Sequence, residues 1–203
     1  MKKLPRSFYL RPTLTVAKEL LGKYLIRKIG DRTLVGKIVE VEAYLGKNDP
    51  ASHAYRGITK RNEVMFKKGG HLYVYFTYGM HFCANIVTGD EGKGSAVLLR
   101  AIEPIEGMEA IMKNRGIEWI DGVMDRWSYG KLLNLTNGPA KLCEAFNIKR
   151  EQNGTDLRQD DIFIARGELI ARNQIGSSTR IGITSATEKK WRFYIKENPY
   201  VSK

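Results

Sequence analysis

Two glutamates and a tyrosine alternate along one apolar segment, and carboxylates gathered beside an aromatic ring are candidates for acid–base chemistry. In residues 38–44 the period-two alternation of a strand places Glu40, Glu42 and Tyr44 on one face and apolar residues on the other. Glutamate is disfavoured in strands and its charge is costly to bury, so the arrangement requires either solvent or a function. Two interpretations stay open from this segment alone: a solvated outer face with ion pairs to lysine and arginine, or a functional site.

The three histidines of the chain, His53, His71 and His81, fall within one short window and raise the question of a metal site. Their spacing matches no zinc signature, and Cys83 and Cys143 lack the paired C-x-x-C spacing of zinc ligands. We therefore predict no metal site and expect His53 to act as a flat ring or a hydrogen-bonding partner. A metal-dependent hydrolase built on the three histidines is the alternative that chelation tests.

A basic segment lies directly before an aromatic segment, and this combination suits nucleic acid. Five aromatic residues fall within residues 73–82, and alternation places Tyr73 and Tyr75 on one strand face and Tyr78 on the other. Flat rings beside basic side chains fit unstacked bases and phosphates, whereas the simpler interpretation is an aromatic strand pair beside a solvated charge run. The basic residues are Arg56, Lys60, Arg61, Lys67 and Lys68, against the single acid Glu63.

The charge of the chain favours an anionic partner. Its 203 residues include 34 Lys and Arg against 22 Asp and Glu, which gives a net charge of +12 and a pI near 9.7. Nucleic acid is the first expected partner and an anionic membrane surface the second. The length suits a single domain over residues 1–203. Without a long apolar run or a signal-peptide pattern after Met1, we expect a cytosolic protein whose two cysteines are reduced and buried.

Hydrophobic periodicity predicts an α+β fold, because strands and helices do not alternate regularly. We expect a mixed, mostly antiparallel sheet with helices packed around it rather than a doubly wound fold. Residues 47–70 are predicted to form a long ordered loop, and the stretch between the last two helices is predicted to be irregular. The predicted strands cover 24–29, 34–44, 95–102, 162–165, 180–184 and 191–195 together with the aromatic strands of 73–82, and the predicted helices cover 13–21, 107–114 and 139–146.

Six motifs occur in a specific order along nearly the whole chain. They are Glu42-Ala-Tyr44-Leu-Gly46, Asp49-Pro-Ala-Ser-His53, Tyr73-Val-Tyr75-Phe-Thr-Tyr78-Gly79-Met80 with Asn85, Leu98-Leu-Arg100-Ala-Ile-Glu103-Pro104, Asn137-Gly-Pro-Ala-Lys-Leu-Cys143 and Trp191-Arg-Phe-Tyr-Ile195. Together they resemble the alkyladenine (methylpurine, 3-methyladenine) DNA glycosylase family and make the chain look like a compact, bacterial-type member. The resemblance implies a curved sheet surrounded by helices, with a protruding β-hairpin that inserts into DNA.

The resemblance implies a DNA repair N-glycosylase that hydrolyses the N-glycosidic bond with a glutamate-activated water. Glu42 matches the family's general base, and Arg100 matches the arginine that positions the water and the glutamate. The same carboxylate stabilises the oxocarbenium character of the transition state. No metal or redox cofactor is required. No lysine is marked by its context as an amine nucleophile, so we expect a monofunctional glycosylase that leaves an abasic site.

A pocket for a flipped purine is also implied by the resemblance. Tyr44, His53 and Tyr75 match the rings that line this pocket, where an electron-rich aromatic sandwich favours a cationic alkylated purine. Asn85 matches a residue near the purine edge, where it would clash with the exocyclic amine of guanine. The implied substrates are 3-methyladenine and 7-methylguanine, with hypoxanthine and ethenoadenine as further candidates.

The implied partner is duplex DNA that contains damaged purines, bound by a monomer in the cytoplasm and associated with the nucleoid of a prokaryote. Tyr78, with Met80 beside it at the hairpin turn, matches the residue that the family inserts between bases. Arg56, Lys60 and Arg61 are the expected contacts to the DNA backbone. The alternative is a non-enzymatic nucleic-acid-binding module that uses the same loop and rings, for which the catalytic glutamate would be incidental.

Overall fold

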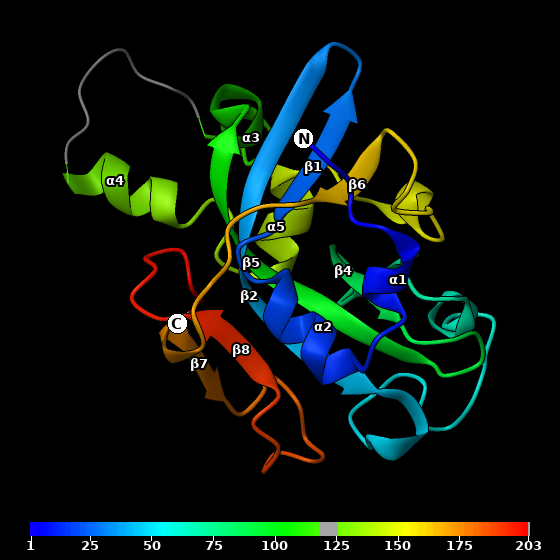
Figure 1. Cartoon of the computed structure of the whole chain (residues 1–203). Helices are drawn as coiled ribbons and strands as arrows, with labels where there is room; N and C mark the ends of the chain where they lie inside the picture. Colours follow the sequence, from blue (N-terminus) through cyan, green and yellow to red (C-terminus); the bar gives the residue numbers. More distant parts are fainter. Residues whose placement is uncertain (118–125, 203) are drawn as a thin grey trace.

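The structure is a computed structural model that describes residues 1–117 and 126–202 and shows one antiparallel sheet with helices packed against it (Figure 1). This is the α+β architecture that the sequence predicts, and the strand pairings of the described ranges are antiparallel. In the same ranges, no helix has the length and apolar character needed to cross a bilayer. The helices are α1 (Arg6–Tyr9), α2 (Thr13–Leu20), α3 (Met108–Asn114), α4 (Arg126–Leu133) and α5 (Pro139–Ala145).

The strands form one continuous path with a side branch. Along the path the order is β3-β4-β5-β2-β1-β6, and β8 joins β2 while also pairing with β7. Consecutive strands therefore lie mostly side by side, as hairpin connections require. The bounds are β1 (Tyr24–Ile29), β2 (Arg32–Leu45), β3 (Leu72–Thr77), β4 (His81–Thr88), β5 (Ser95–Glu106), β6 (Ile162–Ala165), β7 (Ile175–Ser178) and β8 (Arg192–Ile195).

The long strand β2 lies at the centre of the sheet and pairs with β1, β5 and β8. Its first half forms a hairpin with β1 around the turn Gly30-Asp31, where Gly30 adopts a φ of 55°. The register of β2 against β5 shifts on both sides of Glu40, which marks a bulge of the kind that redirects side chains near functional sites. At residues 40–42, β2 pairs with both β5 and β8, so that both of its edges are hydrogen-bonded to neighbouring strands.

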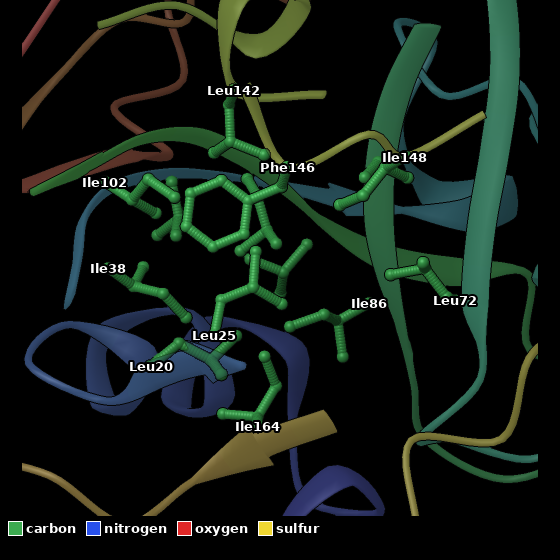
Figure 2. Packing of buried hydrophobic residues seen from close by; sticks show 14 of the residues in the cluster. Leu20, Leu25, Ile38, Leu72, Ile86, Ile102, Leu142, Phe146, Ile148 and Ile164 are labelled. Atoms are coloured by element: carbon green, nitrogen blue, oxygen red, sulfur yellow. The ribbon is translucent and has the colours of Figure 1, made fainter. Parts of the chain in front are cut away.

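The hydrophobic core fills the space between the sheet and helices α2 and α5 (Figure 2). Helix α2 buries Val16, Ala17 and Leu20, which recur at helical spacing on the face that meets β2. The ring of Phe146, directly after α5, lies against β2 at Gly36, where an added Cβ would come within 2.9 Å of a ring carbon. A glycine is therefore required at this position for the helix to pack closely on the sheet that carries the polar residues of β2.

Most predicted elements are confirmed, with ends that differ by a few residues. The strand predicted at 180–184 is wrong, because Arg180 is buried in an ion pair with Asp49 and the backbone N–H of Ile181 donates to a carboxylate rather than to a strand. Elements α1 and β7 are absent from the prediction. Helix α4 occupies part of the stretch expected to be irregular, and residues 118–125 of that stretch lie outside the described residues.

Candidate active site

A cavity of about 460 Å³ is lined by residues of strands β2 to β5 and by the segments 50–53 and 181–185. These segments are far apart in the sequence, so the cavity exists only once the sheet has formed. It brings together residues that the sequence predicts for the base pocket, for catalysis and for the hairpin tip. Those that line it are Tyr44, His53, Tyr75, Tyr78, Asn85 and Arg100.

Glu42 is fully buried and contacts three residues that line the cavity. Its Oε1 accepts a hydrogen bond from the backbone N–H of Ile181 at 2.8 Å and lies 3.2 Å from Nη1 of Arg100. Its Oε2 accepts a hydrogen bond from the hydroxyl of Tyr44 at 2.8 Å. The interpretation of this strand face as solvated is therefore wrong, since Glu40 and Glu42 are both buried and both are paired with Arg100.

The groups around Glu42 hold a fixed pattern of protons and charges. Burial raises the pKa of Tyr44, and the charge of Glu42 raises it further, so the hydroxyl remains a donor. Burial alone would lower the pKa of Arg100, but the charges of Glu42 and Glu40 raise it above its ordinary value. Burial opposes ionisation of Glu40, yet hydrogen bonds from Ser202 and the charge of Arg100 lower its pKa. Glu40 and Arg100 are therefore held in their charged forms, and together with Glu42 they form what we call the floor of the cavity.

Three aromatic rings form one wall of the cavity. The ring centroids of His53 and Tyr75 lie 4.5 Å apart at 77°, and those of Tyr73 and Tyr75 lie 5.6 Å apart at 30°. Nδ1 of His53 lies 3.2 Å from the hydroxyl oxygen of Tyr73. Burial raises the pKa of Tyr73 to about 12 and also raises that of Tyr75, whereas burial and then the charge of Arg61 lower the pKa of His53. The wall is thus uncharged at neutral pH.

Asn85 and Cys83 face these rings from the neighbouring strand β4. The register of the hairpin pairs Tyr73 with Asn85 and Tyr75 with Cys83. The side chain of Asn85 is buried, and its Nδ2 donates to the carbonyl oxygen of Tyr73 at 3.3 Å. This bond fixes the amide at the edge of the cavity, where it limits the shape of any ring that enters.

The hairpin of β3 and β4 presents two large side chains to solvent at its tip. Strand pairing ends at Thr77 and His81, so Tyr78, Gly79 and Met80 form the turn. Tyr78 has a φ of 50°, a left-handed conformation that costs free energy for a residue with a side chain. Tyr78 is 86% exposed and Met80 69% exposed. The turn therefore holds Tyr78 at the mouth of the cavity, away from the core.

The basic loop that precedes the hairpin is ordered by a buried asparagine. The side chain of Asn62 forms three hydrogen bonds with the backbone of the same loop. Arg61 donates to the carbonyl oxygen of Phe76 in β3 at 3.3 Å, which ties the loop to the hairpin. Arg56 and Lys60 are exposed on this loop and leave their charges available to a ligand.

Two buried polar groups behind the cavity are missing from the predicted site. Arg180 contacts both carboxylate oxygens of Asp49, at 2.5 and 2.8 Å, and both side chains are fully buried. The second group consists of Ser202 and Arg192, which converge on the carboxylate of Glu40. The partners lie 131 and up to 162 positions apart in the sequence, so no local spacing could have indicated them.

The three histidines occupy different positions in the structure and make different contacts. His53 lines the cavity, Nδ1 of His71 lies 2.7 Å from the carbonyl oxygen of Lys68, and His81 begins β4. Within residues 1–117 and 126–202, no group of three or more histidine, cysteine, aspartate or glutamate side chains is arranged to hold a metal ion. In this part of the chain, the metal-dependent alternative lacks a ligand set.

Comparison with known protein families identifies the class to which this fold and site belong. A family model described as methylpurine-DNA glycosylase (MPG) matches residues 7–199, and the chain therefore belongs to this family. Membership makes the chain a DNA glycosylase, a hydrolase of N-glycosyl bonds that acts in DNA repair.

Curated relatives are similar over the full length of the chain. A protein from Carboxydothermus hydrogenoformans is 51% identical over 201 residues, which cover 98% of both chains. A protein from Prosthecochloris aestuarii is 46% identical over 100% of this chain and 92% of its own, and one from Clostridium acetobutylicum is 48% identical over 98% and 97%. All three relatives are named for 3-methyladenine DNA glycosylase activity.

Proposed function

We propose that this glycosylase excises 3-methyladenine and 7-methylguanine from duplex DNA, accepts hypoxanthine and ethenoadenine as further substrates, and leaves an abasic site that starts base excision repair. The observation that carries the proposal is the buried carboxylate of Glu42, which contacts Tyr44 and Arg100 in the lining of a cavity that has an uncharged aromatic wall. The names of the relatives, which refer to 3-methyladenine, support the substrate class.

Recognition begins with the charge of the damaged base. Alkylation at a ring nitrogen makes a purine cationic, and the electron-rich faces of Tyr44, Tyr75 and His53 attract such a cation more strongly than a neutral base. The lowered pKa of His53 keeps that ring neutral and avoids repulsion of the cation. Asn85, held against Tyr73, would clash with the exocyclic amine of guanine, and in 7-methylguanine the attraction of the rings for the positive charge offsets this clash.

Glu42 acts as the general base for a water on the opposite face of the sugar. Each carboxylate oxygen has two lone pairs, and the one hydroxyl that donates to Oε2 leaves a position for a water. The water transfers a proton to Oε2 as its oxygen bonds to C1′, and the electron pair of the breaking C1′–N bond goes to the purine. The charge of Glu42 also stabilises the oxocarbenium character of the sugar, while Arg100 holds the other oxygen.

Extrusion of the nucleotide requires a group that fills the gap in the base stack. The exposed ring and thioether at the hairpin tip suit this role: Tyr78 enters between bases, with Met80 beside it. Arg56, Lys60 and Arg61 contact the phosphates that flank the lesion, which accords with the net charge of +12. A monomer suffices for these steps.

The variant Glu42→Gln tests the proposal because it keeps the shape of the side chain and removes the base. We expect the wild-type protein to release the purine from duplexes that each carry one defined lesion. In the variant, the single-turnover rate should fall by about 10²–10⁴-fold, the usual contribution of a general base, with lesion binding retained. Released base and alkali-labile sites measure the rate, and a gel-shift titration measures binding.

Glu106→Gln is the matched control, since Glu106 is exposed on β5, the strand that carries Arg100. It should release base at the wild-type rate. If wild-type protein binds the duplexes but releases no base, the chain is a binding module and the proposal is wrong. Activity that disappears on exhaustive chelation would instead support the metal-dependent alternative.

A further inference from the structure

Glu40 is a fully buried carboxylate for which the proposed reaction has no direct use. Four donors surround it: Nε of Arg100 at 2.8 Å, Nε of Arg192 at 2.6 Å, and the backbone N–H and hydroxyl of Ser202 at 2.7 and 2.8 Å. A buried charge is retained at such a position only when its partners compensate the loss of solvent. The completeness of this set indicates that the geometry around Glu40 is specified rather than incidental.

The guanidinium of Arg100 is divided among three different residues. Its Nε donates to Glu40, its Nη1 lies 3.2 Å from Oε1 of Glu42, and its Nη2 donates to the hydroxyl of Ser202 at 3.3 Å. An arginine beside a carboxylate commonly forms two parallel hydrogen bonds to its two oxygens. Here that arrangement is prevented at Glu42, because the other edges of the guanidinium are already engaged.

Ser202 orients this network through both its side chain and its backbone. Its hydroxyl has a single proton, so by donating to Glu40 it can only accept from Arg100. Its carbonyl oxygen accepts from Nη2 of Arg192 at 2.8 Å. The segment that carries Ser202 is held in place by Asn198, whose Nδ2 donates to a glutamate of β5 at 2.9 Å.

We propose that Glu40 and Ser202 are positioning residues for Arg100. They restrict its guanidinium to one contact with Oε1 of Glu42 and thereby leave Oε2 open to the attacking water. This inference rests on the proposed function of Glu42 as the general base. Without the two residues, Arg100 would rotate to bind both oxygens of Glu42 and would occupy the position of the water.

The variants Ser202→Ala and Glu40→Gln test the proposal, and the second should reduce the rate more than the first. Loss of the hydroxyl should lower the single-turnover rate of base release by about tenfold, and loss of the Glu40 charge by about 10²-fold, since small misplacements of catalytic groups have effects of this size. Affinity for the lesion duplex should stay within about twofold in both, because neither residue lines the cavity. Ser202→Thr, which keeps the hydroxyl, should restore the rate.

Ser177→Ala is the matched control, since Ser177 is exposed on β7 outside the network. Thermal unfolding of each variant identifies a loss of rate that comes from misfolding, and Ser202→Ala is expected to remain folded even if Glu40→Gln does not. Wild-type rates in both Ser202→Ala and Glu40→Gln, together with a strong loss in Glu42→Gln, would overturn this inference and leave the proposed function intact. Equal losses in Ser202→Ala and Ser202→Thr would also overturn it.

Discussion

The floor of the cavity and the tip of the hairpin differ in how their functional side chains are held. At the floor, Glu40 and Glu42 are fully buried, and each of their carboxylate oxygens accepts at least one hydrogen bond. At the tip, Tyr78 and Met80 are exposed in a turn where Tyr78 has a left-handed backbone conformation and the N–H of Met80 donates to the carbonyl oxygen of Thr77 at 3.3 Å. The stability of a buried charge depends on all of its partners, whereas an exposed side chain forms its contacts only when a ligand binds.

This difference indicates that the two regions control different steps of the reaction. A preorganised floor lowers the barrier to bond cleavage because its charges need no rearrangement when charge develops in the transition state. An exposed tip contributes to affinity for DNA, because its stacking contacts exist only in the complex. Changes at the floor should therefore alter stability and rate, and changes at the tip should alter binding.

The largest effect on stability is expected from the ion pair behind the floor. Arg180→Met removes the partner of Asp49 and leaves a fully buried carboxylate without its compensating charge. The free energy of unfolding should fall by about 3–5 kcal/mol, as is typical when one member of a buried pair is removed. Chemical denaturation followed by tryptophan fluorescence measures the change.

Arg11→Met is the matched control for this substitution, because Arg11 pairs with Glu19 at the surface. Loss of that pair should lower the free energy of unfolding by less than about 1 kcal/mol. If Arg180→Met is no more destabilising than Arg11→Met, the floor does not depend on the buried charges behind it, and the contrast with the tip fails.

The sequence predicts the residues that enclose the cavity far better than the residues that support them. Alternation in β2 places Glu40, Glu42 and Tyr44 on one face, and in the structure both carboxylates contact Arg100. The partner Ser202 lies 162 positions from Glu40, and neither hydrophobic periodicity nor local spacing carries information at that distance. Support of this kind depends on tertiary contacts, which a single sequence does not display.

The element predictions fail where polar burial replaces the usual hydrophobic pattern. Residues 180–184 alternate like a strand, yet Arg180 is drawn into the core by Asp49, and the N–H of Ile181 bonds to Glu42. The backbone N–H of Ile181 thus serves the site and not the sheet. By contrast, the strand at 162–165 is predicted to the residue, because its four side chains are all buried.

At the tip, the expected effect is smaller and falls on binding. Tyr78→Ala removes the ring that we propose to stack in the duplex, and a stacked base contributes about 1–3 kcal/mol. Affinity for a lesion duplex should therefore weaken by this amount, measured by fluorescence anisotropy in a Glu42→Gln background that prevents turnover. The free energy of unfolding should change little, because Tyr78 is 86% exposed.

Tyr78→Phe separates stacking from other effects of the substitution. The phenyl ring keeps the flat surface and removes only the hydroxyl, so affinity should remain close to that of the wild-type side chain. An equal loss of affinity in Tyr78→Phe and Tyr78→Ala would assign the effect to the hydroxyl. No loss in either variant would show that the tip does not contribute to binding and that the division between floor and tip is wrong.

The smallest expected effect lies at His53, on the boundary between the two regions. Burial and the charge of Arg61 lower the pKa of His53 below its ordinary value of 6.5, so the ring resists protonation until the pH falls below that value. The folded state then binds fewer protons than the unfolded state, and the contribution of His53 to stability, complete above pH 6.5, is lost as the pH falls. Once the pH is low enough to protonate the ring, His53 should also repel a cationic base. In the Glu42→Gln background, affinity for a 7-methylguanine duplex should fall by a few-fold between about pH 7.5 and 5.5, while an ethenoadenine duplex and the variant His53→Gln should show a weaker dependence. The same pH dependence in His53→Gln would assign the titration to another group.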